Sequence, residues 1–491
     1  MTDDVQLPPN EQTPTSPGQS PAPSPVPPAA PAVPRTPRQS VPANLAYAVV
    51  ITVLILCAKT FFESTAAGRL AEIGAFEFLE QRISNFTGAR LPVVVLDISK
   101  LPGGGTDPTN LLPTPRPVLK EIISALVDAR AAVVGIDIDF APGPAGWISR
   151  AEDPAFFEYC LSVNETTRTR VRLGIFRTRQ LGPDSWLGLP KYSSLAADLA
   201  GTHPEALNSM YRAVQWVVNQ ERHDELPALG YAVAADYLRH SPAPNAPKWL
   251  QPLLIKQEPP RELRPETPHA AQSAAPHDAQ HEPQRGPHDE TSEHEEEETP
   301  GRLVNYSKLQ QLQTERLRAL HRVSVTDAQD DFAGKIVILG DATQRNGADV
   351  FIPPGGELTP GVFYHASAAY TFAFEPLYEF TTLTRTLLDV ALGLPFFAVA
   401  IFKGLQARHA DDEHAEKRWQ RIETLTLYAS AVAVVVLGLV FMLRWRVMWL
   451  DFILVIVALA AHPWLSAKAE ALGHAYSERR AQARVHPPAR T

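Results

Sequence analysis

Four uninterrupted apolar runs mark the chain, one near its N-terminus and three near its C-terminus. The runs occupy residues 43–62, 386–402, 424–443 and 447–466. Each is close to the roughly 20 residues that a helix needs to cross a ~30 Å hydrocarbon core. The pattern therefore predicts four transmembrane helices, with a large globular region at residues 63–383 between the first and the second.

Basic residues near the ends of these runs predict the orientation, because Lys and Arg close to a span resist export. The segment before the first run, the loop of residues 403–422 and the tail of residues 467–491 all carry such residues. We expect a multi-pass membrane protein, with cytoplasmic N- and C-termini and residues 63–383 outside the cytoplasm. The short turn Arg444-Trp445-Arg446 must then lie outside, where its arginines can reach the membrane interface.

The exported region alternates short buried strands with amphipathic helices. Continuous apolar runs rich in β-branched residues at 91–99 and 131–140 predict strands buried on both faces. Residues 117–130 between them have helical spacing, which makes a βαβ unit with parallel strands. Further candidates are strands at 171–176 and 335–339 and helices at 205–218, 226–238 and 362–372. The predicted fold class is α/β with a mainly parallel sheet.

Two polar segments lack large apolar side chains and predict disorder, because they cannot repay the entropy of ordering. The first is a Pro-rich cytoplasmic arm at residues 1–42, and the second is a His/Glu-rich insertion at about residues 241–300. Imidazoles and carboxylates in the insertion could hold Zn, Cu or Ni weakly, but their spacing fits no structural metal motif. We interpret the insertion as disordered and solvating.

Composition narrows the functional classes. The net charge is −9, and no basic stripe in the soluble region predicts a nucleic-acid partner. The two cysteines, Cys57 in the first run and Cys160 in the exported region, allow no disulfide within the soluble domain. No Ser-His-Asp spacing, Walker loop or zinc signature is present, so we expect neither an enzyme nor a cofactor.

Carboxylates follow the predicted strands, at the edge where open α/β sheets bind their ligands. Asp97 ends the first strand, Asp137 and Asp139 end the second, Asp341 follows a third, and Asp349 lies in the next loop. We predict a polar, acidic crevice at this edge of the sheet.

Three uses of the crevice remain open. The carboxylates could hold a hard cation such as Ca²⁺ or Mg²⁺, pair with Arg116 to fix loops, or serve as general acid–base groups of a hydrolase. The structural use and the sensing of a small ligand or ion are favoured over catalysis, and His365 is interpreted as a packed helix residue. The candidate ligand-binding residues are Asp97, Arg116, Asp137, Asp139, Asp341 and Asp349.

An ordered set of segments resembles one family, the extracellular sensory CHASE domain of the second type, found on bacterial cyclases and histidine kinases. In chain order the segments are VVVLDIS, PTPRPVLKEIISAL, VVGIDIDF, LPALGYAVAADYL, LVNYSKL, GKIVILGDAT and PGVFYHASAAYTF. The three closely spaced apolar runs that follow also match, so the resemblance covers about residues 63–466. It implies a sensor of an envelope or extracellular cue.

Proteins of this family usually carry a cyclase, kinase or phosphodiesterase domain after the last span. Here only the basic tail follows, so we expect the signal to leave through a separate partner, such as a kinase, cyclase or second-messenger enzyme, at residues 403–422 or at the tail. A homodimer is compatible with this interpretation. The alternatives are an envelope scaffold that uses the sensory fold as a binding platform and, less favoured, a periplasmic hydrolase.

Overall fold

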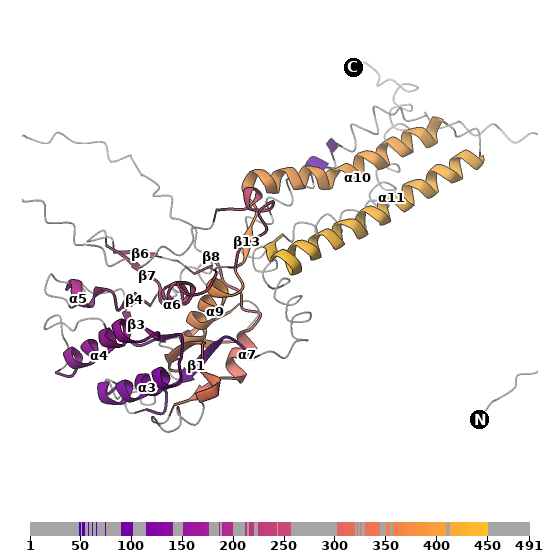
Figure 1. Cartoon of the computed structure of the whole chain (residues 1–491). Helices are drawn as coiled ribbons and strands as arrows, with labels where there is room; N and C mark the ends of the chain where they lie inside the picture. The colour runs from indigo at the N-terminus through magenta and orange to yellow at the C-terminus, as the bar shows by residue number, and fades with distance from the viewer. Residues whose placement is uncertain are drawn as a thin grey trace, which may run out of the picture.

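The structure is a computed structural model that describes most of the chain between residues 90 and 449 (Figure 1). The described stretches are 90–101, 114–140, 151–175, 189–199, 212–213, 216–219, 224–242, 244–256, 302–319, 329–343, 350–353, 357–408 and 413–449, with isolated positions at 49–50, 52–54, 57, 61, 65, 74, 186, 322 and 325. The predictions for residues 1–42, 257–300 and 450–491, for most of the first apolar run, and for Asp349 lie outside these residues.

A six-stranded sheet forms the centre of the soluble domain, and all its pairings are parallel. In spatial order the strands are β4 (Ala196–Asp198), β3 (Arg170–Ile175), β2 (Val133–Ile136), β10 (Ile336–Gly340), β1 (Val93–Asp97) and β9 (Leu317–Arg318). The predicted α/β fold with a mainly parallel sheet is confirmed. The central strands are continuous apolar runs because helices cover both faces of the sheet.

Helices cover both faces of this sheet (Figure 1). On one face lie α3 (Arg116–Asp128) and α4 (Asp153–Thr166), which follow β1 and β2. On the other lie α6 (Leu229–Leu238) and α9 (Gly361–Ala373). Because α9 follows β10, the helices after β10 and after its two neighbours leave the sheet on opposite faces. In α/β folds such a reversal marks the usual ligand-binding edge.

Short strands flank the sheet domain. Strand β5 (Arg212–Ala213) pairs with β8 (Arg302–Leu303), and β6 (Trp216–Asn219) pairs with β7 (Asp224–Pro227), both antiparallel. The predicted helix at residues 205–218 is therefore wrong over its second half. The residues of β6 include two adjacent valines, whose β-branched side chains suit a strand better than a helix. A further pair joins β11 (Val350–Phe351) and β12 (Thr359–Pro360), just before α9.

Two long helices extend away from the α/β domain and lie side by side (Figure 1). They are α10 (Thr382–Arg408) and α11 (Glu413–Leu439), and α11 continues as a π-helix at Val440–Arg444. By length and composition, Thr382–Leu405 and Lys417–Arg444 can each cross a membrane. The described residues thus contain two candidate spans, where the sequence predicted four in the whole chain.

Candidate functional site

Three residues at the carboxyl edge of the sheet lie in one row across β1, β10 and β2. Asp97 is opposite Gly340, and the amide of Asp137 donates to the carbonyl oxygen of Leu339 at 2.7 Å. Side chains at matched positions of neighbouring strands point to the same face. For this row, that face is the one covered by α6 and α9. The predicted grouping of Asp97 and Asp137 beside β10 is therefore present.

Asp97 is held by the backbone around it. Its side chain is 1% exposed, and Oδ1 accepts from the amides of Ser99 at 2.9 Å and Ala342 at 3.3 Å. Oδ2 lies 3.8 Å from Nε of Arg318. These contacts fasten the loop after β1 to the loop after β10 without the Arg116 pairing that the structural alternative assumed.

Asp137 faces the first turns of α9. Its Oδ1 lies 3.8 Å from Nε2 of His365, and the two side chains are 4% and 7% exposed. A Cβ at Gly340 would lie 3.0 Å from Asp137 Oδ2 and 2.7 Å from Cγ2 of Val362, so only glycine lets the helix approach this closely. The N-terminal end of a helix favours a nearby negative charge, which suits the carboxylate of Asp137.

The remaining predicted carboxylates differ in their environments. Asp341 is half-buried, and its Oδ1 accepts from the amide of Thr343 at 2.8 Å and from its hydroxyl at 2.5 Å. Asp139 is exposed. Among the described residues no group of three or more His, Cys, Asp or Glu side chains could hold a metal ion.

Arg116 lies on the opposite face and does not join these carboxylates. Its Nε donates to Oδ1 of Asp153 at 2.6 Å, with both side chains 3% exposed. The guanidinium carbon lies 4.2 Å from the centroid of the Phe140 ring and 5.6 Å from that of Phe156. The predicted pairing with the crevice aspartates is replaced by a clamp between the starts of α3 and α4. The acidic pair Glu152-Asp153 before a proline is the sequence signal for that partner.

A second buried ion pair was missed from the sequence. Arg172 in β3 contacts Asp236 in α6 through Nε–Oδ2 at 2.5 Å and Nη2–Oδ1 at 2.9 Å. Its Nη1 also donates to the carbonyl oxygen of Ser194. An arginine inside an apolar strand and an aspartate inside an apolar helix were the signals for this pair, since buried charges require partners.

The α/β domain meets the long helices at a compact membrane joint, defined here as residues 375–381 together with 441–449. Strand β13 (Tyr378–Glu379) pairs in parallel with β14 (Val447–Met448), and the amide of Tyr378 donates to the carbonyl oxygen of Arg446 at 2.9 Å. Arg446 adopts a positive φ of 54°. The turn Arg444-Trp445-Arg446 therefore lies against the α/β domain.

Two ion pairs and an apolar cluster hold the membrane joint together. The Glu379 carboxylate accepts hydrogen bonds from Nη1 and Nη2 of Arg212 at 2.9 and 2.5 Å. In the second pair, Nη2 of Arg446 lies 2.8 Å from Oε1 of Glu375. The apolar part buries residues from four separate regions of the chain, namely 246–254, Leu303, 377–392 and 434–449. They include Leu250, Leu254, Leu377, Phe380, Phe441, Met442, Val447 and Trp449.

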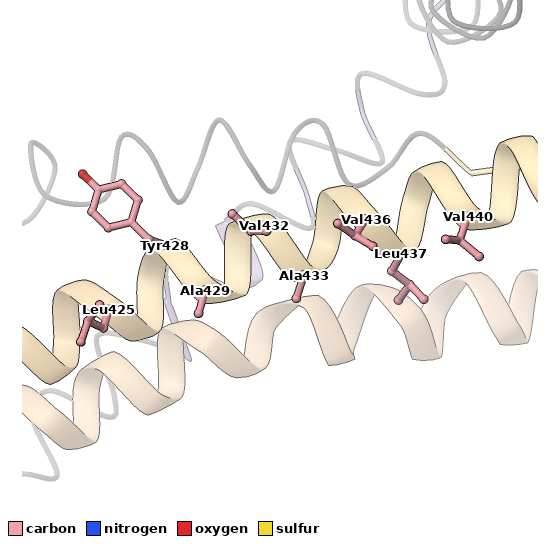
Figure 2. A pocket seen from close by; sticks show the side chains of 8 residues that line it. All are labelled: Leu425, Tyr428, Ala429, Val432, Ala433, Val436, Leu437 and Val440. Atoms are coloured by element: carbon pink, nitrogen blue, oxygen red, sulfur yellow. The ribbon is translucent and has the colours of Figure 1, made fainter. Parts of the chain in front are cut away.

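One face of α11 is a shallow apolar groove without charged groups. Figure 2 shows the side chains that line it, in a row along the helix. They are Leu425, Tyr428, Ala429, Val432, Ala433, Val436, Leu437 and Val440. Several are well exposed, with Tyr428 at 71% and Val432 at 61%. Such a face suits lipid chains or another apolar helix better than a polar ligand.

The fold and these contacts define a class: a three-layer α/β domain joined to two candidate membrane helices. Over residues 50–402 the chain matches the family model of the CHASE2 domain. The chain belongs to the CHASE2 domain family, whose members are extracellular sensory domains rather than catalytic ones. The resemblance inferred from the ordered sequence segments is thereby confirmed. No curated protein and no solved structure matches the chain.

His365 gives the candidate site a predicted pH dependence. Burial disfavours the imidazolium and lowers the pKa of His365 from 6.5 to about 4. As the pH falls below 6.5, the unfolded chain takes up this proton before the folded one, so stability is complete above pH 6.5 and declines toward pH 4. We expect a loss of at most about 2 kcal/mol at pH 5, because the nearby Asp137 carboxylate opposes the effect of burial.

The measurement is chemical unfolding of the full-length protein in detergent between pH 7 and pH 5. His365→Gln removes the titrating group. The variant should therefore lose less unfolding free energy between pH 7 and pH 5 than the wild type, by the amount that the protonation of His365 contributes. A wild-type protein and a variant with identical pH profiles would contradict the prediction.

Proposed function

We propose that the protein is a membrane-bound sensor that detects a cue outside the bacterial cytoplasm and signals through a separate protein. The α/β domain lies outside, α10 and α11 cross the inner membrane, and the loop between them faces the cytoplasm. Basic residues in the last turns of α10 and the first turns of α11, next to this loop, support the orientation. They are Lys403, Arg408, Lys417, Arg418 and Arg421.

The observation that carries this proposal is the position of α9. Its N-terminal turns contact the carboxyl edge of the sheet, through Val362 at Gly340 and His365 at Asp137. Its C-terminal end leads within a few residues into β13 and then α10. All 13 residues of α9 are buried, and at ~1.5 Å per residue the helix spans ~20 Å. One rigid helix thus connects the candidate ligand edge with the membrane joint.

A ligand at this edge can change the signal only if it binds one packing of α9 more tightly than another. The side chains placed to sense such a ligand are Asp137, His365 and Asp341. Asp97 is engaged by two backbone amides and serves to shape the edge. These groups favour a small polar ligand that carries hydrogen-bond donors for the carboxylates.

In-cell photo-crosslinking of the full-length protein tests the proposal. A photoreactive amino acid replaces Gln420, which is exposed near the start of α11, and a matched probe replaces the exposed Glu357 of the α/β domain. We expect the probe at position 420 to capture a cytoplasmic kinase, cyclase or second-messenger enzyme. That capture should be lost when Lys403, Lys417, Arg418 and Arg421 are changed to Gln.

A different result would overturn the sensor proposal. If only exported envelope proteins are captured, from position 357 and unchanged in the loop variant, the fold serves as an envelope scaffold. Capture of a cytoplasmic protein from position 357 would contradict the orientation itself.

A further inference from the structure

A short ordered segment precedes the His/Glu-rich insertion. The sequence predicts a low-complexity insertion from about residue 241, yet residues 248–253 form a compact pair of turns. The amide of Leu250 donates to the carbonyl oxygen of Pro247 at 2.8 Å, and a 3-10 helix follows at Gln251–Leu253. Leu250 and Leu254 are buried in the apolar cluster of the membrane joint, which explains why the segment is ordered.

Backbone contacts place this segment level with the start of α10. The amide of Ile255 donates to the carbonyl oxygen of Glu379 at 2.8 Å, and the amide of Thr381 donates to that of Leu253 at 3.0 Å. On the other side, the rings of Trp249 and Trp445 lie edge to face with centroids 4.9 Å apart. The segment therefore contacts the ends of both candidate spans where they meet the α/β domain.

The outward side of the segment is apolar and flanked by positive charge. Trp249 is 56%, Leu253 38% and Ile255 45% exposed, whereas Leu250 and Leu254 point into the cluster. Lys248 and Lys256 are exposed at its two ends. Tryptophan is enriched at membrane interfaces, and lysines near a membrane surface are attracted to anionic lipid by ~1 kcal/mol each.

We propose that residues 247–256 form an interfacial anchor. The anchor lies in the headgroup region on the extracytoplasmic face of the inner membrane. Trp249, Leu253 and Ile255 reach the boundary of the acyl chains, and the two lysines contact anionic headgroup phosphates. The inference rests on the proposed crossing of the membrane by α10 and α11. The anchor fixes the tilt of the α/β domain, so that motion of α9 is transmitted to α10 rather than lost in rocking of the whole domain.

A lipid surface fits this patch better than a second copy of the chain. The patch is continuous with the ends of the candidate spans, which fixes its depth at the membrane boundary. A two-fold symmetric contact would place the same patch of each copy together, and their lysines would repel one another. Anionic headgroups supply the complementary charge.

Site-directed spin labelling of the full-length protein in nanodiscs, one chain per disc, tests the anchor. In a Cys57→Ser background that retains the buried Cys160, single labels are placed by Leu253→Cys and Ile255→Cys. Ile352→Cys, 50% exposed on the α/β domain, is the aqueous control, and Val432→Cys on α11 is the lipid control. We expect labels 253 and 255 to lose access to a water-soluble nickel chelate and to gain access to oxygen, relative to label 352.

The outcomes separate this inference from the proposed function. If label 432 reports lipid while labels 253 and 255 behave like label 352, the anchor is wrong and the membrane-spanning sensor stands. If label 432 is itself in water, the proposed spans fail. Spin–spin broadening at 253 only in discs with two chains, without lipid contact, would assign the patch to a second copy and overturn the anchor.

The lysines are tested separately. Changing Lys248 and Lys256 together to Gln should reduce lipid contact of label 253 in discs with anionic lipid and leave it unchanged in zwitterionic discs. An equal effect in both lipids would overturn the assigned role of the two lysines.

Discussion

Replacing Arg116 with Met is expected to lower the free energy of unfolding by about 3–5 kcal/mol, because it leaves the Asp153 carboxylate buried without the opposing guanidinium. Both side chains of the pair are 3% exposed, and the guanidinium also lies over the ring of Phe140. The double change Arg116→Met with Asp153→Leu removes both charges and should recover most of the loss. Chemical unfolding of the full-length protein in detergent measures all three proteins.

The pair formed by Arg322 and Asp128 provides a matched control. It has a similar contact distance of 2.5 Å, but its side chains are 49% and 59% exposed. Changing Arg322 to Met should therefore cost less than about 1 kcal/mol. If Arg116→Met costs no more than this control, Arg116 is not a structural clamp and becomes a candidate for ligand binding again.

The local pattern of the sequence was enough to predict the central strands and the carboxylates at their ends. Parallel strands buried on both faces are continuous apolar runs, and β1 and β2 are such runs. The carboxyl ends of parallel strands lie at one edge of the sheet. The sequence could therefore predict that Asp97 and Asp137 share this edge, even though the order of the strands was unknown. The chain order of the helices also gave the right βαβ unit.

The uses of these residues could not be predicted, because they depend on contacts between distant parts of the chain. Strand β10 inserts between β1 and β2, and it pairs Val93 with Ile336. That insertion supplies the amide of Ala342 that holds Asp97, and it places Gly340 beneath α9. Nothing in the neighbouring sequence of Asp97 encodes either contact.

The same limitation explains the ordered segment before the insertion. Its composition around Pro242, Pro244 and Pro247 predicts a break in structure. However, Leu250 and Leu254 are buried in an apolar cluster with residues from 377–392 and 434–449, far along the chain. A short segment of this kind is ordered by the residues that it packs against. It has too few residues for its own hydrophobic pattern to predict that order.

Gly230→Ala is expected to destabilise the protein by about 1–3 kcal/mol through overpacking between α6 and α9. A Cβ at Gly230 would lie 2.7 Å from Cβ of Ala368 and 3.0 Å from the carbonyl oxygen of His365. Since the second contact is with backbone, no side-chain rotation relieves it and the two helices must separate. A Gly→Ala change at an uncrowded helix position would instead stabilise the protein by up to ~1 kcal/mol. A loss of stability in Gly230→Ala would therefore indicate overpacking by its sign alone.

The change at Gly230 also tests whether α9 transmits the signal. Moving α9 away from α6 displaces His365, the residue that faces Asp137 at the candidate ligand edge. Ala368→Gly in the same chain removes the closer contact and should restore part of the stability, and the rest should stay lost because the His365 carbonyl contact remains. Hydrogen exchange should then show increased opening of α9 and β13 in Gly230→Ala, with α3 and α4 on the opposite face unchanged. Equal loss of protection on both faces would mean that α9 does not move as a separate unit, and the proposed route from the ligand edge to the membrane joint would fail.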